Sequence, residues 1–115
     1  MLAKAEIESG LAQCYGTERY WKNQVLCFQY TDGVHFLWES CDAYWLLTAI
    51  SSYRRKESFQ VWNLKKFDDN TAVLTMQEDS DCPYLVQQKI HYTDFPLDEI
   101  QLYLIDGILL LTSEY

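Results

Sequence analysis

Cysteine and histidine are the residue types in this sequence that could supply a nucleophile together with its base. His35 and Cys41 are the nearest such pair along the chain. Six residues of a continuous helix turn through about 600°, so the two side chains would point about 120° apart. A catalytic pair needs its groups within hydrogen-bond reach. The spacing therefore favours a buried cysteine and a surface histidine over a small Cys/His enzyme.

The four cysteines also bear on metal binding, because zinc prefers thiolate and imidazole ligands. Cys14, Cys27, Cys41 and Cys82 are separated by 13, 14 and 41 positions. Zinc and redox motifs instead place two cysteines within a few residues of each other, and cytosolic thiols stay reduced. We therefore expect four small, buried hydrophobic residues, with no metal site and no cofactor.

Carboxylates are the remaining groups that could perform acid–base or metal chemistry. The pairs Asp68-Asp69 and Asp98-Glu99 fall in predicted turns, where a carboxyl group is hydrated, whereas a general acid needs surroundings that raise its pKa. Asp79 and Asp81 resemble the start of a calcium loop, but the central glycine is missing and Ile90 replaces the bidentate glutamate. Phosphate-binding motifs are also absent from the sequence. We predict that the protein is not an enzyme.

The net charge is −8, and it is unevenly distributed along the chain. Residues 1–56 contain six acidic and six basic side chains, whereas residues 57–115 contain eleven acidic and three basic ones. A surface of this kind repels nucleic acid phosphates and attracts basic proteins, because the summed field acts by sign. The charge layout disfavours direct binding of nucleic acid. It fits either a basic protein partner or a surface that only keeps an aromatic-rich domain soluble.

Apolar periodicity predicts helices in the first half of the chain. Residues 2–13 form a short helix with Leu2 and Ile7 among its apolar contacts, and Gly10 or Gly16 can end it. A second helical pattern with apolar residues at steps of three and four covers residues 34–52.

Capping residues define the ends of this second pattern. Thr31 or Asp32 suits the N-cap, and the cations of residues 54–56 suit a helix C-terminus. A break near residues 40–42 would divide the segment into two helices, since Ser40 or Asp42 could cap the second one.

The period changes after Lys56, where five strand-like runs follow one another: Phe59–Lys66, Thr71–Gln77, Tyr84–Tyr92, Gln101–Ile105 and Ile108–Thr112. Turn residues separate them, including Asp106-Gly107, whose glycine can adopt a positive φ. The pattern predicts a β-meander with the last hairpin near its centre, because residues 108–111 are apolar on both faces. Residues 17–30 fit either a strand pair or an extended arm.

Together these elements predict an α+β fold, with N-terminal helices packed on one face of a four- to five-stranded antiparallel sheet. The length and the lack of a linker predict a single domain, residues 1–115. The chain has no apolar run of about eighteen residues, so we expect no membrane span. Two acidic residues near the N-terminus argue against a signal peptide, and we expect a cytoplasmic protein.

Several segments together resemble a small bacterial family of unknown function, over nearly the whole chain. They are Leu11-Ala12-Gln13, Gly16-Thr17-Glu18, Tyr30-Thr31-Asp32-Gly33, Ala43-Tyr44-Trp45-Leu46-Leu47, Phe59-Gln60-Val61-Trp62, the segment Tyr92 to Ile100 (YTDFPLDEI) and Ser113-Glu114-Tyr115. The chain departs from the family pattern at Cys41-Asp42 and at Thr112. The resemblance implies no reaction and no ligand.

Acidic turns beside tyrosine-containing strands are typical of a protein interface with aromatic anchors and an anionic rim. We predict a non-enzymatic binding module for a basic protein surface, of the kind that inhibits a nucleic-acid-binding protein by mimicking nucleic acid, as phage anti-CRISPR and anti-restriction proteins do. An accessory subunit of a host complex, a homodimer included, is the alternative. The predicted partner-binding residues are Asp68, Asp69, Glu78, Asp79, Asp81, Asp98, Glu99 and Tyr84.

Overall fold

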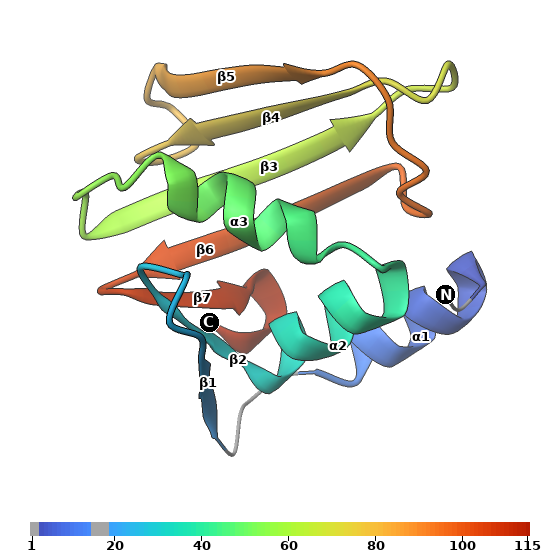
Figure 1. Ribbon diagram of the computed structural model, residues 1–115, viewed down its shortest axis with the longest axis horizontal. Coiled ribbons are helices and arrows are strands. Elements are labelled where there is room, and N and C mark those ends of the chain that lie inside the picture. Colours follow the sequence, from blue (N-terminus) through green and yellow to red (C-terminus); the bar gives the residue numbers. More distant parts are fainter. Residues whose placement is uncertain (1–2, 15–18) are drawn as a thin grey trace.

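The computed structural model describes residues 3–14 and 19–115. Helices cover one face of a seven-stranded sheet (Figure 1). The helices are α1 (Lys4–Ala12), α2 (Asp32–Cys41) and α3 (Tyr44–Ser52), and a 3₁₀ turn, η1 (Thr112–Glu114), follows the last strand. The strands are β1 (Tyr20–Lys22), β2 (Gln29–Thr31), β3 (Phe59–Lys66), β4 (Ala72–Gln77), β5 (Tyr84–Ile90), β6 (Glu99–Ile105) and β7 (Ile108–Leu111). The predicted α+β class is confirmed.

The sheet is larger than predicted, and its strands are ordered differently. Seven strands lie in the order β1-β2-β7-β6-β3-β4-β5, rather than four or five. All neighbours are antiparallel except β2 and β7, which run parallel, so the sheet is mixed. The predicted meander is wrong, because β6 pairs with β3 and β7 and not with β5.

The connection from β5 to β6 explains this order. Residues 91–98 leave the edge strand and pass the ends of β4 and β3 before β6 begins. The Thr93 amide donates to the Asn70 carbonyl at 2.8 Å, and Phe95 and Leu97 are buried in the core. Because this crossing is anchored and apolar, it brings β6 to the centre of the sheet. The central position predicted for the last hairpin is therefore confirmed.

Residues 20–31 form a strand pair, which is one of the two alternatives that the sequence left open. The other was an extended arm. β1 and β2 are antiparallel, with Trp21 opposite Tyr30. β2 then joins β7 and extends the main sheet by two strands. Each strand has three residues, which is too short to show a period of two. Leu2, Gly16 as a possible helix end and the motif Gly16-Thr17-Glu18 lie outside the described residues.

The predicted break between α2 and α3 is confirmed, but its capping differs. The Thr31 hydroxyl caps α2 by accepting a hydrogen bond from the Val34 amide at 3.3 Å. Asp42 adopts a left-handed conformation, φ 52°, and ends α2. Contrary to the prediction, neither Ser40 nor Asp42 caps α3, because Ala43 is the N-cap and makes no side-chain bond there. The turn at Asp42 is what separates the two helices.

The ends of α1 and α3 also differ from expectation. α1 continues past Gly10, where the ring of Phe36 packs so closely that an added Cβ would lie 2.2 Å from it. Gly10 therefore permits the contact between α1 and α2 rather than ending a helix. The cations of residues 54–56 follow Tyr53, the C-cap of α3, and none lies in its last turn. Arg55 instead pairs with Glu57 at 2.8 Å.

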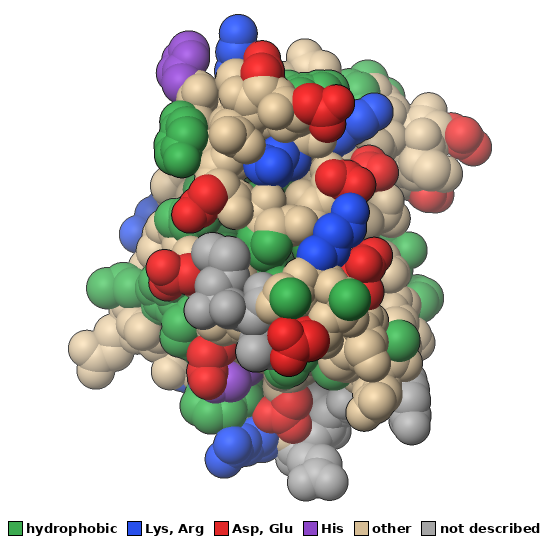
Figure 2. All heavy atoms as spheres, turned by 90° about the vertical axis from the view of Figure 1, so that its right-hand side faces the viewer, with side chains coloured by type: hydrophobic (Ala, Val, Ile, Leu, Met, Phe, Trp, Pro, Cys, Tyr) green, Lys and Arg blue, Asp and Glu red, His purple; other side chains and the backbone are tan. Residues whose placement is uncertain are grey.

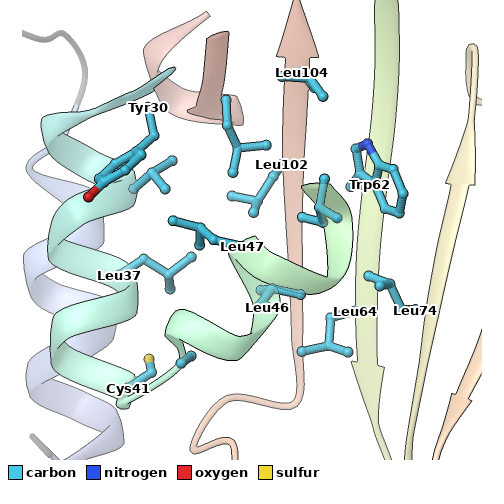
Figure 3. Packing of buried hydrophobic residues seen from close by; sticks show 14 of the residues in the cluster. Tyr30, Leu37, Cys41, Leu46, Leu47, Trp62, Leu64, Leu74, Leu102 and Leu104 are labelled. Atoms are coloured by element: carbon cyan, nitrogen blue, oxygen red, sulfur yellow. The ribbon is translucent and has the colours of Figure 1, made fainter. Parts of the chain in front are cut away.

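The core lies between the helices and the sheet (Figure 3). Leucines of α2 and α3 face Trp62 and the leucines of β3, β4 and β6; labelled in the figure are Leu37, Leu46, Leu47, Leu64, Leu74, Leu102 and Leu104. On the other face of the sheet, Phe59, Tyr103 and Tyr115 form a ring cluster with centroids 5.3–5.9 Å apart. The core fixes the sheet, and the sheet fixes where its connecting turns emerge.

Candidate partner-binding surface

The turn between β3 and β4 carries Asp68 and Asp69, which we call the first acidic turn. Both side chains are exposed, and Asn70 completes the turn with φ 65°. The Asp69 carboxylate accepts hydrogen bonds from the Thr71 hydroxyl at 2.6 Å and the Thr71 amide at 3.1 Å. These bonds, led by the one from the hydroxyl, lower the pKa of Asp69. The first acidic turn therefore holds one carboxylate in a fixed orientation and leaves the other in solvent.

The turn between β4 and β5 carries Glu78, Asp79 and Asp81, which we call the second acidic turn. All three side chains are exposed. The Gln77 side chain closes the turn by donating to the carbonyls of Asp79 at 2.6 Å and Cys82 at 2.9 Å. None of the five carboxylates of the two acidic turns forms a salt bridge with a described residue. Their charge is thus available to another molecule.

The predicted partner-binding residues do not form one patch. Successive strands alternate in direction, so the two acidic turns lie at opposite ends of the sheet. Asp98 and Glu99, at the start of β6, lie at the same end as the first acidic turn, since Lys65 is opposite Glu99 in the sheet. Figure 2 shows this end, where Asp and Glu side chains are spread over the face with Lys and Arg side chains between them.

Asp98 and Glu99 bond to side chains of other elements, whereas the carboxylates of Asp69 and Asp79 bond to neighbours in their own turns, Thr71 and Ser80. Asp98 pairs with Lys4 of α1 at 2.9 Å, and this hydrogen bond is the main cause that lowers the pKa of Asp98 and raises that of Lys4. The carboxylate of Glu99 accepts a hydrogen bond from the Asn63 side chain at 3.0 Å. These two residues fasten α1 and β3 to β6 as well as adding charge.

Tyr84, the predicted aromatic anchor, lies at the start of β5 beside the second acidic turn. It is 54% exposed, and Leu85 next to it is 38% exposed. Tyr92, just beyond the other end of β5, is 71% exposed. Apolar side chains therefore mark both ends of the edge strand, where the carboxylates also lie.

A cleft of about 620 Å³ beside α2 went unnoticed in the sequence. The His35 imidazole stacks on the Trp21 ring with centroids 3.8 Å apart, and its Nε2 lies 2.8 Å from the Glu39 carboxylate. The Arg19 guanidinium lies 4.3 Å from the Trp21 ring centre, and the Trp21 indole donates to Asp32 at 2.8 Å. Sequence reasoning missed this cluster because only the β1–β2 pairing brings Trp21 beside α2.

The cysteines occupy sites that differ in accessibility. All four are free thiols; Cys27 is exposed, whereas Cys41 is buried. Burial raises the pKa of Cys41 to about 11, and α2 runs unbroken through His35 and Cys41, as the 120° argument assumes. The expectation of four buried cysteines holds for Cys41 and is wrong for Cys27, which lies on the loop after β1; Cys14 and Cys82 are only partly buried. Among the described residues, no three His, Cys, Asp or Glu side chains are grouped to hold a metal ion.

The model of one protein family matches residues 5–115. The chain belongs to DUF6876, a family of unknown function. The resemblance seen in the motifs is thereby confirmed. Comparison with curated proteins and with solved structures finds no match. Within the described residues, no helix is both long enough and apolar enough to span a membrane.

Motifs that link the chain to DUF6876 hold distant segments of the fold together. The Glu114 carboxylate accepts hydrogen bonds from the Thr31 hydroxyl at 2.6 Å, the Leu111 amide at 3.0 Å and the Gly33 amide at 3.3 Å. This contact joins the last turn of the chain to the first turn of α2. In the segment from Tyr92 to Ile100, buried Phe95 secures the crossing to β6. The contacts of these two segments hold the architecture together.

Proposed function

We propose that the protein is a non-enzymatic binding module that presents carboxylates to a basic protein surface. One observation carries the proposal: five exposed carboxylates stand on two hairpin turns, and no described cation forms a salt bridge with them. Exposed charges of one sign steer an oppositely charged partner and raise its association rate.

A partner that binds nucleic acid would offer the matching surface. Such a protein arranges lysine and arginine side chains to contact phosphates, and spaced carboxylates supply negative charge to the same groups. The proposed activity is therefore inhibition of a basic nucleic-acid-binding protein by occupying its binding groove, which is how an anti-CRISPR or anti-restriction protein of the decoy type works. The cytoplasm is the compartment where such a partner would be met.

The test compares two variants with the same change in net charge. Asp68→Asn with Asp79→Asn removes one carboxylate from each acidic turn, whereas Asp42→Asn with Asp106→Asn removes two exposed carboxylates elsewhere. Both control positions have a positive φ, which asparagine tolerates. The probe is octalysine, titrated by calorimetry at low and at moderate salt.

We expect the turn variant to weaken octalysine binding about fivefold more than the control, because an exposed charge pair contributes about 0.5 kcal/mol and two are lost. Binding by the unmodified protein should also weaken steeply with salt. Equal losses in the two variants would show that the attraction depends on net charge alone, and this result would contradict the proposal. Binding that is insensitive to salt would do the same.

A further inference from the structure

β5 is an edge strand whose outer side meets no described strand (Figure 1). It is seven residues long, whereas β1 at the other edge of the sheet has three. An exposed edge offers unpaired backbone amides and carbonyls to another chain. β5 is therefore the longer of the two places where the described sheet could accept a further strand.

The hydrogen-bond pattern tells which backbone groups of β5 are free. The Phe67 amide donates to the Thr71 carbonyl across the β3–β4 turn, and antiparallel pairing alternates between neighbouring strands from there. Residues 72, 74 and 76 consequently bond to β5, where their partners are residues 90, 88 and 86. The backbone groups of residues 87 and 89 then point to the open edge, whereas the pairing shifts register between Met76 and Gln77 and leaves Leu85 outside the regular alternation.

The usual protections of an edge strand are weak along β5. Natural edges carry proline, several charges, a β-bulge or a covering loop. A register shift opposite Met76 and Gln77 disturbs the start of β5, but the pairing is regular from Val86 to Ile90. That part of the strand has no proline, and Lys89 is its one charged residue. The proline nearest to β5 in the sequence is Pro83, just before the strand. Exposed Tyr84 and Leu85 add apolar area at the start of the strand. The regular part of the edge, from Val86 to Ile90, is therefore suited to pairing.

Charge decides between the candidate occupants. The second acidic turn precedes β5, and the first acidic turn lies at its far end together with exposed Asp94. If a second copy paired antiparallel with β5, each acidic end would face the opposite acidic end of its partner, and like charges would repel. A strand with cations at both ends would meet carboxylates at both ends, about 20 Å apart.

We propose that β5 binds an extended segment of the basic partner as an eighth strand, with lysine or arginine at both ends of a mostly uncharged centre. This inference rests on the proposed function and specifies how the same surface would recognise its partner. Main-chain bonds to residues 87 and 89 supply affinity, as in other cases of strand addition. The two acidic turns select the charge of the segment ends.

The test uses a nine-residue peptide with two lysines at each end and alternating threonine and valine between them. Gln87→Pro removes an amide from the open edge without touching the bonds to β4, since proline is tolerated on edge strands. Gln87→Ala is the matched control, because it shortens the same exposed side chain and keeps the amide. Circular dichroism verifies that both variants are folded.

We expect Gln87→Pro to weaken peptide binding at least about fivefold, and Gln87→Ala to leave it within about twofold. If both variants bind as the unmodified protein does, while Asp68→Asn with Asp79→Asn weakens binding, strand addition is wrong and the proposed function stands. Loss of all salt-sensitive binding to both lysine probes would remove the two proposals together.

Hydrogen exchange provides a measurement that does not depend on the proline variant folding. The amides of Gln87 and Lys89 should exchange more slowly when the lysine-ended peptide is added to the unmodified protein. Unchanged exchange at these two amides in the bound state overturns the proposal. Sedimentation should show a monomer without peptide, and a dimer dispersed by Gln87→Pro would assign the edge to a second copy instead.

Discussion

Replacing Glu114 by alanine tests how the end of the chain stabilises the fold. The Glu114 carboxylate accepts three hydrogen bonds, two of them from the Thr31 hydroxyl and the Gly33 amide at the start of α2. It also lies where the positive end of the helix dipole favours a negative charge. Glu114→Ala removes all of these interactions at once and leaves their donors partly covered.

The expected cost follows from the kinds of bond that are lost. A hydrogen bond to a charged group contributes about 1.5–3 kcal/mol, and the helix terminus adds about 0.3–1 kcal/mol. Glu114 is half-buried, so water can replace part of what is lost, and the total is well below three full bonds. We expect Glu114→Ala to lower the free energy of unfolding by about 2–4 kcal/mol. Glu114→Gln, which keeps an acceptor oxygen, should cost about 1–2 kcal/mol.

Urea denaturation followed by tryptophan fluorescence measures these differences, provided that the slope m is unchanged. Glu8→Ala on the exposed side of α1 is the control, with an expected effect within about 0.5 kcal/mol. A double-mutant cycle with Thr31→Val should give a coupling energy of about 1 kcal/mol between Thr31 and Glu114. If Glu114→Ala costs no more than the control, the carboxylate contact does not stabilise the fold and the reasoning is refuted.

Two further predictions concern thiols and pH. In alkylation at neutral pH, exposed Cys27 should react first. Cys41 is buried and its pKa is raised to about 11, so it should react only when the protein unfolds. Rapid labelling of Cys41 in the folded state would contradict this burial. The pair of Asp98 with Lys4 should stabilise the fold at neutral pH. This contribution should disappear as the pH falls through the lowered pKa of Asp98, and again as it rises through the raised pKa of Lys4. The stability difference between the unmodified protein and Asp98→Asn, measured across pH, should vanish at both extremes; a constant difference would count against the ion pair.

The longer strands were predictable because their side chains alternate over enough residues. β3 has the predicted bounds, Phe59–Lys66, and the bounds of β4 to β7 differ from prediction by two residues or fewer. β1 and β2 escaped prediction because three residues cannot establish a period. The position of β6 between β3 and β7 depends on which of several apolar strands pair, and this choice follows from packing across the whole sheet rather than from any local pattern.

The candidate site was predictable in composition but not in arrangement. Aspartates in turn sequences are exposed, as the chemistry of turns requires. Their division between two ends of the sheet could have been inferred, because turns that precede and follow one strand must lie at its opposite ends. The cleft around His35 could not have been inferred from the sequence, because Trp21 reaches it from a separate hairpin. The alternating direction of consecutive strands can thus be inferred locally from the sequence, whereas a cluster of side chains from different elements can be recognised only when the fold is known.

Exposed carboxylates such as Asp68 are not required by the architecture, and this helps to separate two explanations of the charge, solubility and binding. Substituting an exposed turn carboxylate such as Asp68 usually changes stability by less than about 0.5 kcal/mol, whereas Thr31 and Glu114 bond to each other across the fold. The charge at such turn positions is therefore explained by a property other than folding, either solubility or binding. Solubility depends on the total charge and is indifferent to its position. Binding depends on position, so variants of equal net charge must behave alike under the first explanation and differently under the second.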